Sequence, residues 1–278
     1  MRASIATEPG SAKANEDWAG VTNHAAVVLD GVTAPADLGT GCTHTTPWYV
    51  RTLGAFLLST AEADPGIPLA NVLAEAIRQV AALHENSCDL THPGTPSTTV
   101  ALAREHDDAL EYLVLSDATI VIDGQDGIEV ITDKRVEDVA AAEREAAQEQ
   151  PPGTPERQRL MHRLVTEQRR HKNRPGGYWV AGADPEAAKH AVTGVRENVR
   201  RAALLTDGAA VLAADYGLVG WEGLLDVLGI DGSAGLIERV RQAEARDPQA
   251  CRWPRYKPSD DAAAVYLEFG QVAGVDDA

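Results

Sequence analysis

The stretch "NEDWAGVTNHAAVVLDG", residues 15–31, places apolar runs on both sides of a short polar turn at Asn23 and His24. Such a pattern is typical of a β-hairpin. A turn centred between these two residues sets Asp17 directly opposite Asp30, with their Cβ atoms ~5 Å apart. Two like charges at that distance destabilise a sheet unless one is protonated or a cation lies between them. The hairpin therefore predicts a metal site.

Other acids fall at the ends of other predicted strands. Asp207 follows the apolar run "RAALLT" and precedes Gly208, and Asp260 and Asp261 open the last predicted strand. The end of one strand and the start of its antiparallel neighbour share an edge of the sheet, so we expect these acids to meet. For any one of them alone, a role as a cap or turn residue is an equal alternative.

A cluster of carboxylates also predicts the chemistry of the site. Oxygen ligands favour Mg²⁺ or Mn²⁺, whereas zinc prefers His and Cys. Two hard cations side by side activate water and clamp a phosphoryl oxygen. The acids therefore predict hydrolysis of a phosphate ester.

The order of the predicted elements indicates an α+β fold with mostly antiparallel sheets. Asp184 and Pro185 mark the start of one helix, as its cap and its first residue. The stretch from Lys134 to Arg174 is charged, helical and interrupted by "PPGTP". Strands are expected within 1–31, 97–133, 178–182, 200–208 and 262–269, and the other helices at about 45–62, 68–86, 218–229 and 233–246.

Composition limits the partners and the compartment. The chain has 278 residues and a formal net charge of −17, which repels nucleic acid and anionic membranes, so we expect neither as a partner. Solubility alone is the other explanation of this charge. Three cysteines without paired spacing indicate reduced thiols, and no apolar run has the length of a secretory or membrane-spanning segment. We therefore expect a cytoplasmic protein.

Six short motifs in order resemble those of the metal-dependent PPM phosphatases, the type 2C serine/threonine phosphatases, from about residue 4 to residue 269. They are "NED" (15–17), "VVLDG" (27–31), "GTPSTTVAL" (94–102), "LSDA" (115–118), "LLTDG" (204–208) and "SDDAAAV" (259–265). Each is weak alone, but six in order are a specific signal. The resemblance implies a four-layer α-β-β-α sandwich in which two central antiparallel sheets carry the metals at one end. It also implies a single domain over 1–278, with a helical, flap-like insertion at about 134–176.

The resemblance further implies which residues hold the metals. Asp30 would bridge two Mn²⁺ or Mg²⁺ ions, and the carbonyl of Gly31 and the carboxylate of Asp207 would complete their shells. Asp260 takes the remaining ligand position, or Asp261 if the register shifts by one. Asp30 and Asp207 would then be the catalytic acids.

Three more acids have weaker implied roles. Asp17, with Glu16 as a second candidate, would act through bound water. Asp117 matches the acid that supports a third metal site together with Asp207. The implied reaction is attack of an activated water on phosphorus with no phosphoenzyme, so it requires no nucleophilic side chain.

The chain departs from the family pattern where a proton donor and a phosphate-binding Arg are expected. After the "LDG" motif, "VTAPADLGTGCTHTTPW" (32–48) lacks the usual aromatic or His residue and Gly pair. His44 is the candidate general acid, with a cap at a helix start as the alternative. Ala12 stands where the family has the Arg, so Lys13 or Arg2 is the candidate for binding phosphate.

Two other stretches have both a functional and a structural explanation. "CTH" (42–44) suggests a thiol–imidazole site, but packing and capping explain it without a third partner. The basic run "RRHKNRPGG" (169–177) falls where the family has a flap beside the active site. It attracts a phosphorylated substrate or simply ends a solvated helix.

The sequence therefore predicts a Mn²⁺- or Mg²⁺-dependent phosphomonoesterase that acts on phosphoserine or phosphothreonine in a protein. A small phosphorylated metabolite is the alternative substrate, because the Arg and the Gly pair are absent. A catalytically silent domain that binds a phosphoprotein or regulates a partner is the alternative from another class. Its acids would repel each other without compensation. An unrelated two-metal nuclease is opposed by the net charge.

Overall fold

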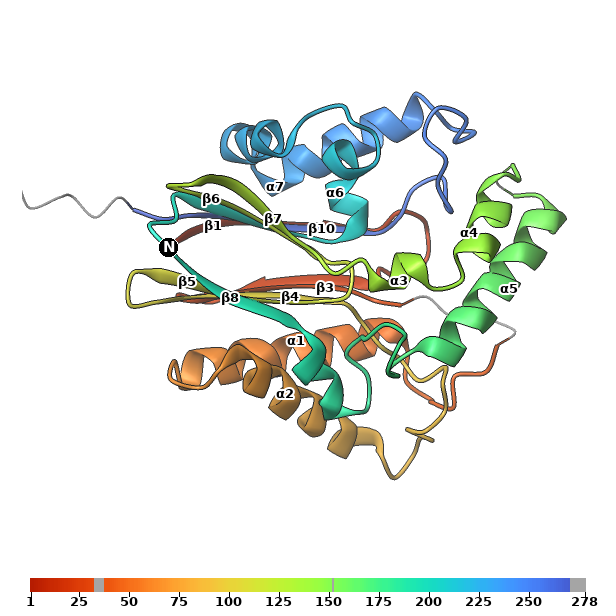
Figure 1. Cartoon of the computed structure of the whole chain (residues 1–278), viewed down its shortest axis with the longest axis horizontal. Helices are drawn as coiled ribbons and strands as arrows, with labels where there is room; N and C mark the ends of the chain where they lie inside the picture. Colours follow the sequence, from red (N-terminus) through yellow and green to blue (C-terminus); the bar gives the residue numbers. More distant parts are fainter. Residues whose placement is uncertain (33–37, 152, 271–278) are drawn as a thin grey trace, which may run out of the picture.

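The computed structural model describes residues 1–32, 38–151 and 153–270. Its ten strands form two five-stranded antiparallel sheets, which are stacked face to face at the centre of the molecule (Figure 1). One sheet has the order β1-β10-β9-β6-β7 and the other has the order β2-β3-β4-β5-β8. The strands are β1 (Arg2–Glu8), β2 (Asp17–Val21), β3 (Ala25–Asp30), β4 (Val100–His106), β5 (Ala109–Leu115), β6 (Thr119–Gly124), β7 (Gly127–Ile131), β8 (Val192–Glu197), β9 (Arg201–Leu205) and β10 (Ala262–Glu268).

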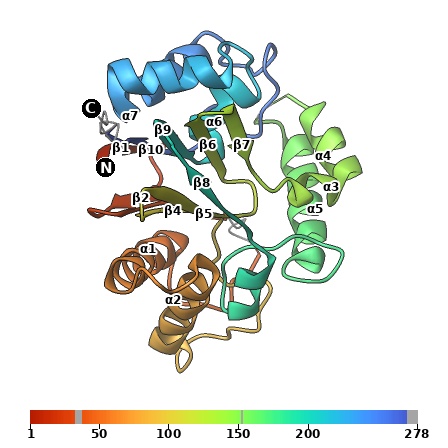
Figure 2. The ribbon, with the colours of Figure 1, turned by 60° about the vertical axis from the view of Figure 1, so that its left-hand side comes forward.

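Helices cover the outer face of each sheet, which completes four layers and confirms the predicted α-β-β-α sandwich. α1 and α2 cover the β2–β8 sheet, α6 and α7 cover the β1–β7 sheet, and α3, α4 and α5 stand at one end (Figures 1 and 2). The helices are α1 (Thr46–Ala63), α2 (Leu69–His84), α3 (Arg135–Asp138), α4 (Ala141–Gln148), α5 (Pro155–His171), the 3₁₀ helix η1 (Pro185–His190), α6 (Asp207–Ala214) and α7 (Trp221–Ala245). None of the helices in the described part of the chain combines the length and the apolarity that crossing a membrane requires.

Strand β3 shows how the two sheets share one core. Val27 and Leu29 pack against α1 and α2, whereas Ala26 and Val28 pack between the two sheets. Alternate side chains of a strand point to opposite faces, so both faces of β3 are buried. This explains why "AAVVL" is apolar throughout. A third cluster lies between the other sheet and α6 and α7.

Two contacts join the β2–β8 sheet to α1 and to the α1–α2 connection. The Trp18 ring lies on Gly20 of the same strand and on Gly54 of α1, where an added Cβ would lie 2.3 Å from ring atoms at either glycine. Arg104, 1% exposed, donates to Glu111 at 3.0 Å and to the carbonyl of Ile67 at 2.8 Å. Its buried charge is thus paired and hydrogen-bonded.

Several predicted elements differ from those observed. The run 109–123 makes two strands in different sheets, because Ser116 turns the chain with φ 65°. The predicted strand 178–182 is reduced to two isolated bridges, one between Ala181 and Thr98 and one between Tyr178 and Lys172. The predicted helix from Pro185 is a 3₁₀ helix capped by Asp184. The edge strand β8 and the helix α6 were not predicted.

Candidate metal centre

The predicted pairing of Asp17 with Asp30 across the β2–β3 hairpin is confirmed. Asp17 begins β2 and Asp30 ends β3, so both carboxylates lie at the same end of the sheet. Asp17 is only 6% exposed, and its Oδ2 atom has no hydrogen-bond partner in the described structure. A buried carboxylate oxygen without a partner is costly unless a cation satisfies it.

Strands of both sheets deliver three more acids to this end. Asp207 follows β9 and begins α6, Asp117 lies in the turn between β5 and β6, and Asp260 lies just before β10. The register places the last residue of β9, Leu205, opposite both Thr119 and Ala264. The ends of these strands therefore meet, as antiparallel pairing predicts.

The pKa values of the paired acids record this crowding. Burial raises the pKa of Asp30 well above its ordinary value, and the negative charges of Asp207 and Asp17 raise it further. Burial, followed by the charge of Asp207, likewise raises the pKa of Asp17. The two acids therefore resist ionising together.

Asp207 and Asp117 respond to the same environment. Solvent reaches the Asp207 side chain, but protein atoms crowd around it. This crowding, with the charges of Asp260 and Asp117, raises the pKa of Asp207 to about 7. Burial also raises the pKa of Asp117. The group is thus short of positive charge in the absence of metal ions.

Lys257 is a cation at this centre that sequence reasoning missed. Its Nζ lies 2.6 Å from Asp260 Oδ1. Burial alone would lower the pKa of Lys257, but the charges of Asp260, Asp30 and Asp207 raise it above its ordinary value. The only signal in the sequence was its position three residues before Asp260, which a turn brings into contact.

Asp260 and Asp261 have different surroundings. The two carboxylate oxygens of Asp261 accept hydrogen bonds from the backbone N–H groups of Gly10 at 2.8 Å and Glu16 at 2.7 Å. Asp261 therefore ties the β1–β2 connection to the start of β10. The charge of Asp260 instead raises the pKa values of Asp17, Asp30 and Asp207.

Two glycines allow the backbone to pack closely here. A Cβ on Gly31 would lie 2.5 Å from the carbonyl oxygen of Glu16, and one on Gly208 would lie 2.0 Å from that of Asp261. Any larger residue would push these segments apart. The Gly that follows Asp30 and the Gly that follows Asp207 are thus both explained by packing at the centre.

The donor set fits hard divalent cations. Carboxylates with raised pKa values, an orphaned Asp17 Oδ2 and the nearby carbonyl of Gly31 are oxygen ligands of the kind that Mg²⁺ and Mn²⁺ bind. Positive charge here would favour the ionised acids and remove the mutual repulsion. Asp17, Asp30, Asp117, Asp207 and Asp260 are the side chains that could hold such ions.

Two predicted site residues lie in other surroundings. Arg2 pairs with Glu268 at the start of β1, whereas Glu8 at the other end of that strand pairs with Ala262 beside the acids. Six residues of strand span ~20 Å, so the prediction that Arg2 binds phosphate here is wrong. The Nδ1 atom of His44 lies 3.6 Å from the sulfur of Cys42, in a separate cluster, so this geometry gives no support to its predicted role as general acid.

A groove of about 1060 Å³ opens beside the centre. Its lining includes Lys13, Glu16, Lys257 and Asp261, together with the Trp48 ring of α1. Lys13 and Lys257 are therefore cations on a path to the acids. A phosphate group that entered this groove would meet both charges.

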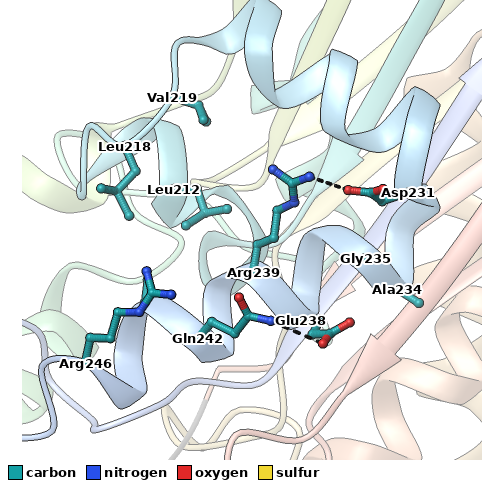
Figure 3. Close-up of a pocket in the computed structure, with 11 residues that line it drawn as sticks. Leu212, Leu218, Val219, Asp231, Ala234, Gly235, Glu238, Arg239, Gln242 and Arg246 are labelled. Carbon is teal, nitrogen blue, oxygen red and sulfur yellow. Dashed lines mark hydrogen bonds and ion pairs between the residues drawn. The ribbon is translucent and has the colours of Figure 1, made fainter.

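A second cleft of about 810 Å³ lies on the outer helical layer, between the α6–α7 connection and the second half of α7 (Figure 3). Four of its polar side chains are paired with one another, Arg239 with Asp231 at 2.5 Å and Gln242 with Glu238 at 3.2 Å. None of the five acids lines this cleft.

The predicted helical stretch near 134–176 contains α3, α4 and α5 at the end of the sheets where the acids meet (Figure 2). The positive charge of Arg144, on α4, partly offsets the rise in the pKa of Asp117. The Arg144 side chain also donates to the hydroxyl of Tyr256 at 3.3 Å. Beyond α5, Lys172 Nζ donates to the Ser97 hydroxyl at 3.2 Å, and burial, followed by the charge of Arg169, lowers the pKa of Lys172 to about 8. Sequence reasoning did not identify Arg144, and it included Lys172 only as part of the basic run 169–177.

Comparison with known proteins agrees with this architecture. Stp1 from Staphylococcus aureus, a serine/threonine phosphatase, is similar with a TM-score of 0.60 and 15% identity over 97% of this chain and 95% of that one. The catalytic domain of the serine/threonine protein phosphatase PstP, solved with two manganese ions, has a TM-score of 0.55 and 16% identity over 96% and 97%. MsPP from Mycobacterium smegmatis, a PPM Ser-Thr phosphatase solved with cacodylate, has a TM-score of 0.55 and 18% identity over 97% and 99%. At these identities, the likeness shows a shared fold.

No curated protein matches the sequence. The family model described as "Protein phosphatase 2C" matches residues 13–229, which is most of the chain and includes Asp17, Asp30, Asp117 and Asp207. The chain therefore belongs to the protein phosphatase 2C family of metal-dependent phosphatases.

Proposed function

We propose that the protein hydrolyses phosphoserine or phosphothreonine in phosphorylated proteins, with two Mn²⁺ or Mg²⁺ ions at the acidic end of the sheets. The observation that carries this proposal is the pair of Asp17 and Asp30, which face each other while the charge of Asp207 acts on both. Bound ions of this kind polarise a phosphoryl group and activate the attacking water.

Each acid has a distinct task in the proposal. Asp30 is the proposed bridging ligand, because it faces Asp17 across the hairpin and the charges of Asp207 and Asp117 also act on it. Asp207, Asp260 and the Gly31 carbonyl complete the set, and Asp117 serves a third, weaker site with Asp207. We assign Asp261 to positioning, because backbone N–H groups occupy both of its oxygens.

The groove supplies the remaining roles. Asp17 and Glu16 would hold ordered water beside the ions. Lys13 and Lys257 would orient the substrate phosphate through charge in place of a bidentate Arg. The 134–176 insertion would belong to the same domain and lie beside the substrate. The protein would act in the cytoplasm. The role of general acid is not assigned to His44.

The experiment measures hydrolysis of an aryl phosphate and of phosphoserine and phosphothreonine peptides. The protein is stripped with chelator and then given Mn²⁺, Mg²⁺ or Zn²⁺ separately. We expect chelator to abolish turnover and Mn²⁺ or Mg²⁺ to restore it. Activity that survives chelation, or no activity under any condition, would overturn the proposal. Hydrolysis of the aryl ester but not of the peptides would indicate that the substrate is a small phosphorylated metabolite.

Substitutions locate the activity. Asp30→Asn and Asp207→Asn should each lower kcat at least ~100-fold, because each removes a proposed ligand. Asp226→Asn is the matched control, since this exposed acid pairs with Arg201 on another part of the surface. Lys13→Met should raise KM more than it lowers kcat. Equal losses in the Asp226 variant would show that the effect is not specific to the centre.

A further inference from the structure

We propose that Cys42, His44, His84 and Cys88 form a second metal site, which binds a structural zinc ion. Each of these four residues offers one potential ligand atom, and the four atoms lie within 4.8 Å of one another. Two thiols and two imidazoles are the donors that zinc prefers, unlike the oxygen donors of the acidic centre.

The separations match a tetrahedral ion. With bonds of ~2.3 Å to sulfur and ~2.0 Å to nitrogen, tetrahedral zinc requires S···N separations of about 3.5 Å and an S···S separation of about 3.8 Å. Cys42 Sγ lies 3.6 Å from His44 Nδ1 and 3.4 Å from His84 Nδ1, and Cys88 Sγ lies 3.5 Å from His44 Nδ1. The two sulfurs are 3.0 Å apart and need to separate by only about 0.8 Å.

The surroundings support thiolate sulfur. The backbone N–H of His44 donates to Cys42 Sγ at 3.3 Å, and that of Thr43 donates to Cys88 Sγ at 3.4 Å. N–H donors aimed at sulfur stabilise the negative charge that a zinc-bound thiolate carries. A simple apolar packing cluster does not require such donors.

The two histidines are also held in place. The His44 ring stacks on Trp48 with centroids 4.0 Å apart, and His84 is 1% exposed at the last turn of α2. His84 and Cys88 are separated by three residues, a spacing that zinc sites use. A disulfide between Cys42 and Cys88 would leave the convergence of both imidazoles unexplained.

The site joins the segment before α1 to the end of α2 and the residues that follow it. Cys42 and His44 precede α1, His84 is the last residue of α2, and Cys88 lies four residues beyond it. The same segments share a hydrogen bond from the Asp89 N–H to the Gly41 carbonyl at 2.8 Å. With four protein ligands, the ion has no open position for a substrate, so its role is structural. It would fix the entry to α1, whose Trp48 lines the groove beside the acids.

The first test measures bound metal without any variant. The protein is purified under reducing conditions, and zinc is quantified by elemental analysis against protein concentration. We expect about one tightly held zinc per chain, retained through dialysis that removes Mn²⁺ and Mg²⁺. Replacement by Co²⁺ should give the visible absorption of a tetrahedral cobalt–thiolate site. Absence of zinc after stoichiometric loading, or an octahedral cobalt spectrum, would overturn the proposal.

The second test uses variants and a matched control. Cys42→Ser and Cys88→Ser should lower bound zinc at least ~10-fold, whereas Cys251→Ser, at an exposed thiol outside the cluster, should retain it. Asp30→Asn should also retain zinc, so failure of the acidic centre and failure of this site are distinguishable. Peptide mapping that finds a Cys42–Cys88 disulfide in the native, reduced preparation would refute the zinc assignment.

Discussion

Asp30→Asn should stabilise the metal-free protein, although we expect the same substitution to lower kcat at least ~100-fold. Asp17 and Asp30 face each other at a Cβ separation of ~5 Å, where two full charges repel by about 3 kcal/mol at an effective dielectric constant of 20. Asp30 is partly exposed, so solvent screening reduces this figure. We expect the free energy of unfolding to rise by roughly 1 to 3 kcal/mol at pH 8.

The pH dependence gives the sign of the effect. Because the folded pKa of Asp30 is raised, the native protein keeps a proton that the unfolded chain loses above pH ~4. The stability of the metal-free wild type should therefore fall as pH rises above ~4, by up to ~1.4 kcal/mol per unit for each such acid until its folded pKa is passed. The advantage of Asp30→Asn should be small at pH 5 and larger at pH 8.

Urea unfolding at both pH values measures this, in buffer freed of Mn²⁺ and Mg²⁺ and again with Mn²⁺. Mn²⁺ at ~100 times its dissociation constant should add ~2.7 kcal/mol to the wild type and much less to the variant. Asp123→Asn is the contrasting control, because its carboxylate is bound by Arg200 and Arg201, so its loss should destabilise. Destabilisation by Asp30→Asn at both pH values without metal would refute the reasoning.

Three further changes test the packing and the buried charges. Gly54→Ala should lower the free energy of unfolding by about 1 to 3 kcal/mol in urea titrations, because its methyl group would overlap the Trp18 ring; an unchanged midpoint would contradict this contact. Arg104→Ala should cost about 3 to 5 kcal/mol because it removes the buried guanidinium that pairs with Glu111, and a loss below 1 kcal/mol would show that water replaces the pair. Because the pKa of Lys172 is lowered in the folded protein, the unfolded chain holds an extra proton between pH ~8 and ~10.4. The stability of the wild type relative to Lys172→Met should therefore rise with pH across that range, by roughly 1 to 3 kcal/mol. A difference that does not change with pH would contradict burial of this amine.

The sequence carried the parts of the fold that depend on local pattern. The alternation around Asn23 fixes the register of the β2–β3 hairpin, and therefore the meeting of Asp17 and Asp30. The acid that follows one apolar run and the acids that precede another also gave the positions of Asp207 and Asp260. A strand that is buried on both faces must be apolar throughout. A short stretch of sequence is therefore enough to reveal it.

Other features depend on contacts that the sequence pattern does not record. The sequence does not show that the pairing of β1 with β10 places Arg2 at the end of β1 opposite to the acids. The edge strand β8 carries exposed residues such as Val192 and Val195, so it lacks a clear pattern of burial. His84 and Cys88 lie across two helices from Cys42, and the short "CTH" motif therefore showed no third partner.

The two groups of ligands differ in when they can form during folding. The hydrogen bond from the Gly10 N–H to Asp261 joins residues 251 positions apart, so the acidic group assembles only after β10 has paired with both β1 and β9. Loop closure over such a distance is slow. The Cys and His ligands need only the α1–α2 pair, so they can meet while most of the chain is still unfolded. Affinity for manganese would thus report completion of the fold, and affinity for zinc would report its beginning.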